Sequence, residues 1–205
     1  MALLRFAALA TLASCLCLSA YSQPISVGFV GGSSLTEGFE ASTIPASASG
    51  FSPSYTFYST AKGYVVGASV EVRLPFHLVI EADALYRPLS YAYTATYPGG
   101  GAPFTGPSQA VLTWEVPLLW KYRFSNKKVN PFIEAGPSFR ASGNPNGTAP
   151  SNSGISVGGG VEIRALFLRV ALEIRYTRWA ADQPVPPWAK TNPNQVEFLV
   201  GVSFP

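Results

Sequence analysis

Residues 154–179, GISVGGGVEIRALFLRVALEIRYTRW, decide the fold class of this chain. Apolar or small side chains occupy alternate positions from Ile155 to Ile163 and again from Leu168 to Tyr176. Charges of both signs stand between them, at Glu162, Arg164, Arg169, Glu173 and Arg175. A period of two is that of a β-strand, and two such strands across a short link form a hairpin. The pattern therefore predicts a hairpin with one apolar face and one charged face.

The composition favours a single all-β domain. Only 12% of the 205 residues are charged, against about 25% in ordinary soluble domains. Gly and Pro are frequent, with 19 and 18 copies, and no long helical repeat is present. The formal net charge of +3 is small and the basic residues are dispersed, which argues against a nucleic-acid partner.

Residues 1–22 have the features of a signal peptide, so residues 23–205 form the predicted mature domain. Arg5 supplies a positive start, and residues 6–18 are apolar but too few to span a bilayer. Small residues permit cleavage after Ser22 or after Ala20. The chain is therefore predicted to be exported.

Both cysteines, Cys15 and Cys17, lie in this segment. The mature chain would then have no disulfide framework. Residues 12–15 also resemble a lipobox, which would make Cys15 a lipidated N-terminus, and this alternative to simple cleavage stays open.

Alternation predicts six more strands besides the opening hairpin. They are expected at residues 25–32, 63–74, 78–87, 112–124, 133–140 and 196–204. The connections alternate between long (33–62, 97–107, 141–153 and 180–193) and short (75–77, 125–130 and 165–167). Eight antiparallel strands joined in sequence by alternating long and short loops predict an up-and-down topology.

Two features complicate this simple pattern. The good β formers Tyr55, Phe57 and Tyr58 leave open an extra strand at the end of the first long loop, and the strand at 78–87 has a possible continuation through 91–93. Proline cannot donate to a β-ladder, so a bulge or local distortion is expected at each in-strand proline, Pro117 and Pro137.

The charged residues collect on one face of the predicted strands. Eight acidic and eight basic side chains lie opposite the apolar series: Glu71, Glu81, Asp83, Glu115, Glu134, Glu162, Glu173, Glu197, Arg73, Arg87, Lys121, Arg123, Arg140, Arg164, Arg169 and Arg175. Balanced charges among glycines and serines suit the inside of a small barrel, where opposite charges pair. We therefore expect a structural ion-pair network across a plugged lumen, because an eight-stranded barrel is just wide enough to be filled by side chains.

Large aromatic residues stand towards the strand ends on the apolar face. They are Trp114, Trp120, Tyr122, Phe124, Tyr176 and Phe204. Amphipathic rings at strand ends are typical of the girdles at membrane interfaces. In lipid every backbone polar group must be paired, so a strand protein has to close on itself. The sequence therefore predicts a closed eight-stranded antiparallel transmembrane β-barrel, surrounded by lipid in a bacterial outer membrane.

The signal peptide, the eight alternating strands and a last strand carrying Phe204 resemble the outer-membrane β-barrel families of the OmpA transmembrane-domain and OmpX type, including the opacity-like surface proteins. The resemblance covers Ile25 to Phe204 and concerns architecture. It implies the barrel assembly machinery as a partner that reads the terminal aromatic residue. Members usually end on that residue, whereas Pro205 follows it here.

No catalytic, cofactor-binding or metal-binding residue is predicted. The only histidine, His77, lies in a short turn, at the opposite rim from the His and Ser pair of barrel-type lipid A deacylases. Glu81 and Asp83 have arginines nearby and favour ion pairing over acid-base chemistry. Gly158 to Gly160 lack the lysine and helix of a phosphate loop, and the chain has no Cys or His cluster for a metal.

The predicted function is a structural or surface-interaction role, including adhesion, through long extracellular loops. Aromatic residues stand in those loops at Phe39, Phe51, Tyr55, Phe57, Tyr58 and in 91–104. They could meet an extracellular ligand, or they could rest on one another above the barrel or be disordered. A narrow-channel porin is one alternative. A soluble, secreted, lipocalin-like binding barrel is another, and it requires the inverse arrangement of apolar and charged faces.

Overall fold

The computed structural model describes residues 25–45, 52–60, 63–125, 127–143, 150–165, 168–180 and 189–204. The predicted signal peptide at 1–22, Phe51 and Pro205 lie outside these ranges. The described residues form eleven strands: β1 (Ile25–Ser34), β2 (Ser42–Ile44), β3 (Ser54–Ser59), β4 (Tyr64–Arg73), β5 (Leu78–Thr96), β6 (Phe104–Thr105), β7 (Gln109–Arg123), β8 (Val129–Ser142), β9 (Ser153–Ala165), β10 (Leu168–Trp179) and β11 (Asn194–Phe204).

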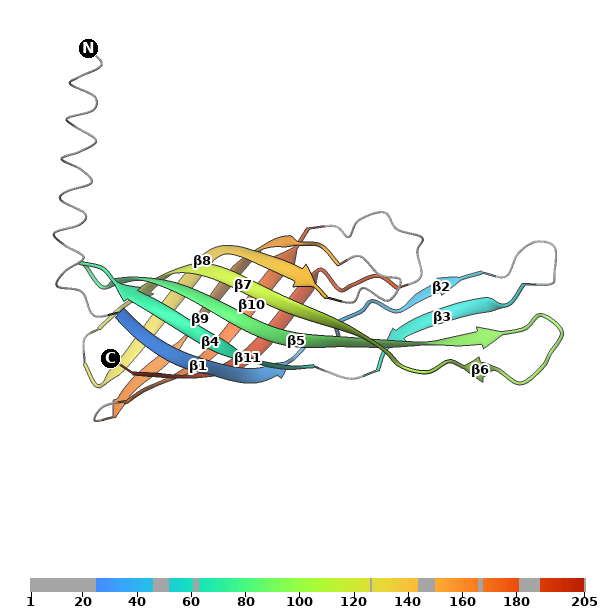
Figure 1. The fold of residues 1–205 in the computed structure, drawn as a ribbon, viewed down its shortest axis with the longest axis horizontal. Coiled ribbons are helices and arrows are strands. Elements are labelled where there is room, and N and C mark those ends of the chain that lie inside the picture. Colours follow the sequence, from blue (N-terminus) through green and yellow to red (C-terminus); the bar gives the residue numbers. More distant parts are fainter. Residues whose placement is uncertain are drawn as a thin grey trace, which may run out of the picture.

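Eight of these strands close into one antiparallel barrel, which confirms the predicted fold (Figure 1). Its order is β1-β4-β5-β7-β8-β9-β10-β11, so each barrel strand lies beside the next one in sequence. The last strand, β11, pairs with β1, from Val27↔Phe204 to Ser34↔Glu197. Within the part of the chain described, no helix is long and apolar enough to cross a membrane.

The short connections, β4–β5, β7–β8 and β9–β10, lie at one end of the barrel, which we call the short-turn rim (Figure 1). The other end is the long-loop rim. At the short-turn rim, Phe76 and His77 both adopt positive φ, 61° and 65°. Two consecutive residues in this region form the tight primed turn that matches the twist of a hairpin, and the Leu78 amide closes it onto the Pro75 carbonyl.

Three short strands extend the sheet beyond the long-loop rim, where the sequence predicted loops. β5 runs for 19 residues and overhangs the barrel; its end, 91–96, pairs with β3, and β3 pairs with β2. On its other edge β5 pairs with β6. We call β2, β3, β6 and the end of β5 the extension (Figure 1). The expected loops at 33–62 and 97–107 were therefore wrong in part, although the open possibilities of a strand at Tyr55–Tyr58 and of a longer β5 are confirmed.

The two in-strand prolines interrupt pairing without adding a residue. The β5–β7 ladder lacks the two pairs between Ala82 and Leu85, opposite Pro117, with the same register on both sides. The β7–β8 ladder is interrupted in the same way near Pro137. A bulge would shift the register by one residue. Of the two expected alternatives, the bulge is wrong and the local distortion is confirmed, as a local loss of ladder pairing.

Candidate functional site

The barrel has its charged face inside and its apolar face outside. Of the sixteen charged residues predicted to face the lumen, fourteen are buried, while Arg73 and Arg164 are half-buried. The six predicted girdle aromatics all point outward and are exposed. So are residues along the barrel wall such as Phe29 and Ile174. This orientation contradicts the lipocalin-like alternative, which needed an apolar interior.

At the long-loop rim the lumen holds two arginines and two glutamates. The Arg87 guanidinium donates to Glu197 at 2.7 Å, and the Arg140 guanidinium donates to Glu115 at 3.1 Å. Arg87 and Glu115 also approach to 3.8 Å. The charges balance in this layer, so each buried ion has a partner of opposite sign, as a low-dielectric interior requires.

Gln195 and Trp179 complete this layer, and neither was predicted. The Gln195 Oε1 atom accepts from Arg87 at 2.6 Å, from Arg140 at 2.7 Å and from Trp179 Nε1 at 2.7 Å. The Arg140 guanidinium lies over the Trp179 ring, 3.7 Å from its centre. Both residues lie on the lumen side of their strands, in the same alternation that identified the charged residues. This alternation could have been used to predict them.

In the middle of the barrel, Arg175 is surrounded by carboxylates. Its Nε donates to Glu173 at 2.7 Å and to Glu134 at 3.1 Å. Its Nη1 donates to Asp83 at 2.8 Å. The side chain is 1% exposed. Arg175 is thus the main cation of the central layer.

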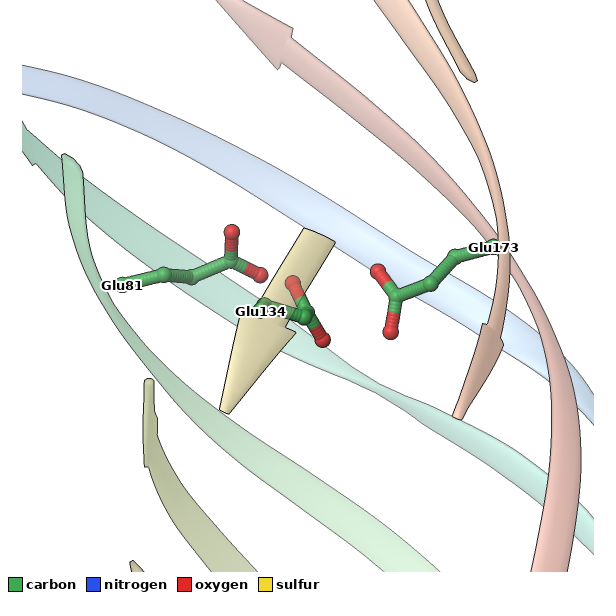
Figure 2. A group of neighbouring side chains, drawn as sticks. All are labelled: Glu81, Glu134 and Glu173. Carbon is green, nitrogen blue, oxygen red and sulfur yellow. The ribbon is translucent and has the colours of Figure 1, made fainter. Parts of the chain in front are cut away.

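The central layer also contains a group of three carboxylates, which Figure 2 shows converging from Glu81, Glu134 and Glu173. Their oxygens come within 4.8 Å of one another, a spacing that a hard cation could bridge. Lys121, however, pairs with Glu81 and lies 3.3 Å from Glu134, while Arg175 contacts all three. The positions for a cation are already taken by an ammonium and a guanidinium, so this group is an ion-pair network rather than a metal site.

At the short-turn rim, four arginines lie near two glutamates, and three of these arginines pair with them. Arg123 lies 2.9 Å from Glu71 and 2.5 Å from Glu162, and Arg169 lies 3.2 Å from Glu71. Arg164 approaches Glu162 only to 3.8 Å. Arg73, predicted as a member of the network, hydrogen-bonds the neutral Ser26 hydroxyl and makes no ion pair with any described residue.

The described lumen leaves little free space. One cavity of about 20 Å³ lies between the central layer and the short-turn rim, lined by Ser69, Glu71 and Glu173 among others. A second, of about 10 Å³, lies near Glu115 and Thr177. Each is the size that one water molecule needs. Cavities of this volume are far smaller than a continuous ion pathway through the barrel would be.

The extension has a small core of its own above the barrel. Phe39, Phe57 and Tyr91 are buried together with Leu89 and Val111, and the Phe39 and Tyr91 rings are 5.0 Å apart. Burial raises the pKa of the Tyr91 phenol. Phe39, Phe57 and Tyr91 therefore pack against one another, which is one of the alternatives that the sequence left open for the loop aromatics.

The other face of the extension carries a row of threonines. Thr43 pairs with Thr56, Thr56 with Thr94, and Thr94 with Thr105, so one threonine from each of the four strands stands in register. All but Thr94, which is half-buried, are exposed. Residues 41–61 and 88–114 contain no Asp, Glu, Lys, Arg or His. The extension is thus an ordered, uncharged and hydroxyl-rich surface.

His77 has the geometry of a turn residue. Its carbonyl accepts the Arg123 amide at 3.0 Å, and its ring lies 6.3 Å from that of Tyr122. It belongs to the short-turn rim, while the loops that could hold a substrate lie at the opposite rim. The position supports the turn role that the sequence predicted for it.

Comparison with known proteins agrees with this architecture. Residues 8–204 match the model of the outer membrane protein β-barrel domain family. Among solved structures, Neisserial surface protein A is similar with a TM-score of 0.53 at 17% identity, over 88% of this chain and 95% of that one. The outer membrane protein OprG from Pseudomonas aeruginosa gives 0.49 at 12% identity, over 88% and 94%. No curated protein matches.

Proposed function

Because this chain belongs to the outer membrane protein β-barrel domain family and is located in the outer membrane, we propose that it is a surface-interaction protein whose extension meets an uncharged partner outside the cell. In such barrels the short turns face the periplasm and the longer loops face outward. The extension then stands beyond the lipid on the extracellular side. Its own core distinguishes it from a set of unstructured loops.

The observation that carries this proposal is the threonine face. Four in-register hydroxyls, two of which, Thr43 and Thr56, lie 3.2 Å apart, offer donors and acceptors at the regular spacing of neighbouring strands. The absence of charge across 41–61 and 88–114 removes attraction to anionic and cationic partners alike. Neutral glycans, which present many hydroxyls and no charge, are the partner class that fits.

A glycan array with neutral and with sulfated or sialylated oligosaccharides tests the proposal on the purified barrel in detergent. We expect retention on neutral glycans, and loss of retention in the double variant Thr56→Glu/Thr94→Glu. The single variant Ser125→Glu adds a carboxylate at the opposite rim and is expected to bind like the parent. Binding that is confined to anionic glycans, or that survives the double variant, would contradict the proposal.

A narrow channel is the other candidate function. The two cavities, of about 20 and 10 Å³, and the close ion pairs across the lumen count against it. The barrel is therefore proposed to be closed, with its ion-pair network serving structure.

A further inference from the structure

The short-turn rim carries more positive charge than its carboxylates can match. Four arginines reach the lumen there from four strand ends: Arg73 on β4, Arg123 on β7, Arg164 on β9 and Arg169 on β10. The carboxylates that pair with them are those of Glu71 and Glu162. Among the described residues, two positive charges are left without a counter-charge in this layer, and the exposed Lys127 and Lys128 in the adjoining turn add two more.

Arg123 and Arg169 make most of the ion-pair contacts with the two glutamates. Arg123 contacts both carboxylates at 2.9 Å or less, and Arg169 binds Glu71 and the Ser26 hydroxyl. These two arginines are buried and belong to the closed network.

Arg73 and Arg164 are the two cations that remain. Arg73 donates only to the Ser26 hydroxyl at 3.2 Å among its described contacts, and Arg164 stays 3.8 Å from Glu162. The Nε atom of each has no hydrogen-bond partner in the described structure. Both side chains are half-exposed at the mouth of the barrel, so an anion from the periplasm can reach them.

The pairing of the strands makes this arrangement costly. Arg164 lies directly opposite Arg169 in the β9–β10 register, on the same face. Like charges directly across a ladder destabilise a sheet. The central layer, where Glu81, Asp83, Glu134 and Glu173 face only Lys121 and Arg175, offsets this charge over the lumen as a whole. It does not supply acceptors to the guanidinium groups at the mouth.

We propose that the mouth of the short-turn rim, between Arg73 and Arg164, is a binding site for a phosphate group. Two unmatched positive charges correspond to the two negative charges of a phosphate monoester or of inorganic phosphate. Guanidinium groups present parallel N–H donors that fit phosphate oxygens in pairs. A single carboxylate would leave one charge unmatched. The phosphate can come from a free periplasmic ligand or from the headgroup of an inner-leaflet lipid. The site is independent of the extracellular extension.

Calorimetry with inorganic phosphate tests the free-ligand source, using the whole folded protein in a phospholipid-free, nonionic detergent at about 0.15 M sodium chloride. We expect binding to the parent, and binding about ten-fold or more weaker in Arg73→Gln and in Arg164→Gln, since each loses a charge-assisted contact. Arg178→Gln removes an exposed arginine at the long-loop rim and is the matched control, with unchanged binding. Heat-dependent gel mobility verifies that each variant is folded.

Native mass spectrometry tests the lipid source by comparing retention of phosphatidic acid with that of diacylglycerol, which lacks the phosphate. Retention of phosphatidic acid that falls in Arg73→Gln and Arg164→Gln, but not in Arg178→Gln, supports the lipid arm even when inorganic phosphate does not bind. The proposal is overturned when neither probe binds, when both rim variants bind like the control, or when succinate binds as tightly as phosphate.

Discussion

Replacing Arg175 with methionine is expected to remove a large part of the stability of the barrel. The guanidinium makes three hydrogen bonds of 2.7 to 3.1 Å to Glu173, Asp83 and Glu134 and is buried. A hydrogen bond to a charged group contributes about 1.5–3 kcal/mol, so three of them place the loss at about 4.5 kcal/mol or more. This agrees with the roughly 3–5 kcal/mol that follows when one partner of a buried pair is removed.

Urea unfolding of the protein in lipid vesicles, followed by tryptophan fluorescence and gel mobility, measures this loss. Arg178→Met is the matched control: Arg178 is exposed and bonds Asn194, so we expect a change below about 1 kcal/mol. Adding Asp83→Asn and Glu173→Gln to Arg175→Met is expected to recover more than half of the loss, because these are the two described carboxylates that pair with Arg175 alone, whereas Glu134 keeps Lys121. A loss in Arg175→Met no greater than in Arg178→Met would refute the view that the buried ion pairs hold the lumen together.

Three further outcomes follow from the same structure. Single-channel recordings in planar bilayers are expected to show no stable conductance, and steady ohmic openings would contradict the closed lumen. Ile174→Arg is expected to lower the free energy of unfolding in vesicles by roughly 2–4 kcal/mol, against about 0–1 kcal/mol for Tyr176→Arg nearer the rim; equal effects would count against the lipid-facing assignment. Gly32→Ala is expected to lower the free energy of unfolding by about 1–3 kcal/mol, because an added Cβ would overlap the Phe198 carbonyl oxygen. Gly31→Ala is expected to be nearly neutral, because the atom nearest to its added Cβ is 3.9 Å away. Similar urea midpoints for the two variants would argue against this register.

The barrel strands were predictable because their two faces differ so strongly. In β10, Leu172 and Ile174 alternate with Glu173 and Arg175, and only one assignment of that pattern to lumen and lipid avoids charges in hydrocarbon. The extension lacks this contrast. In β3, Thr56 and Phe57 differ, but β2 and β6 have three and two residues, too few for a period to emerge. Their strand conformation comes from pairing beside the overhang of β5, which no local pattern encodes.

The sequence predicted which side chains of the candidate site face the lumen, but it did not predict which of them contact one another. Parity places Arg87 and Glu197 inside the barrel, but their contact joins residues 110 positions apart across the lumen. Which charges meet depends on the stagger between strands, and a stagger is a property of the closed barrel rather than of any one strand. For the same reason the sequence did not predict the shortage of carboxylates near Arg73 and Arg164. The lumen has eight acidic and eight basic residues in total, but they are distributed unequally along the barrel axis.

That buried ions are costly raises the question of why this lumen contains so many of them. Pairing a strand one residue out of register exchanges its two faces. For β10, such a slip would move Arg169, Glu173 and Arg175 into hydrocarbon, where each arginine near the bilayer midplane costs roughly 2–4 kcal/mol. A lumen filled with leucine and valine would attach no such penalty to the slip, because both faces would then be apolar. The charged lumen therefore specifies the register of every strand that contributes to it, and its eight acidic and eight basic side chains stabilise the correct barrel chiefly by destabilising the wrong ones.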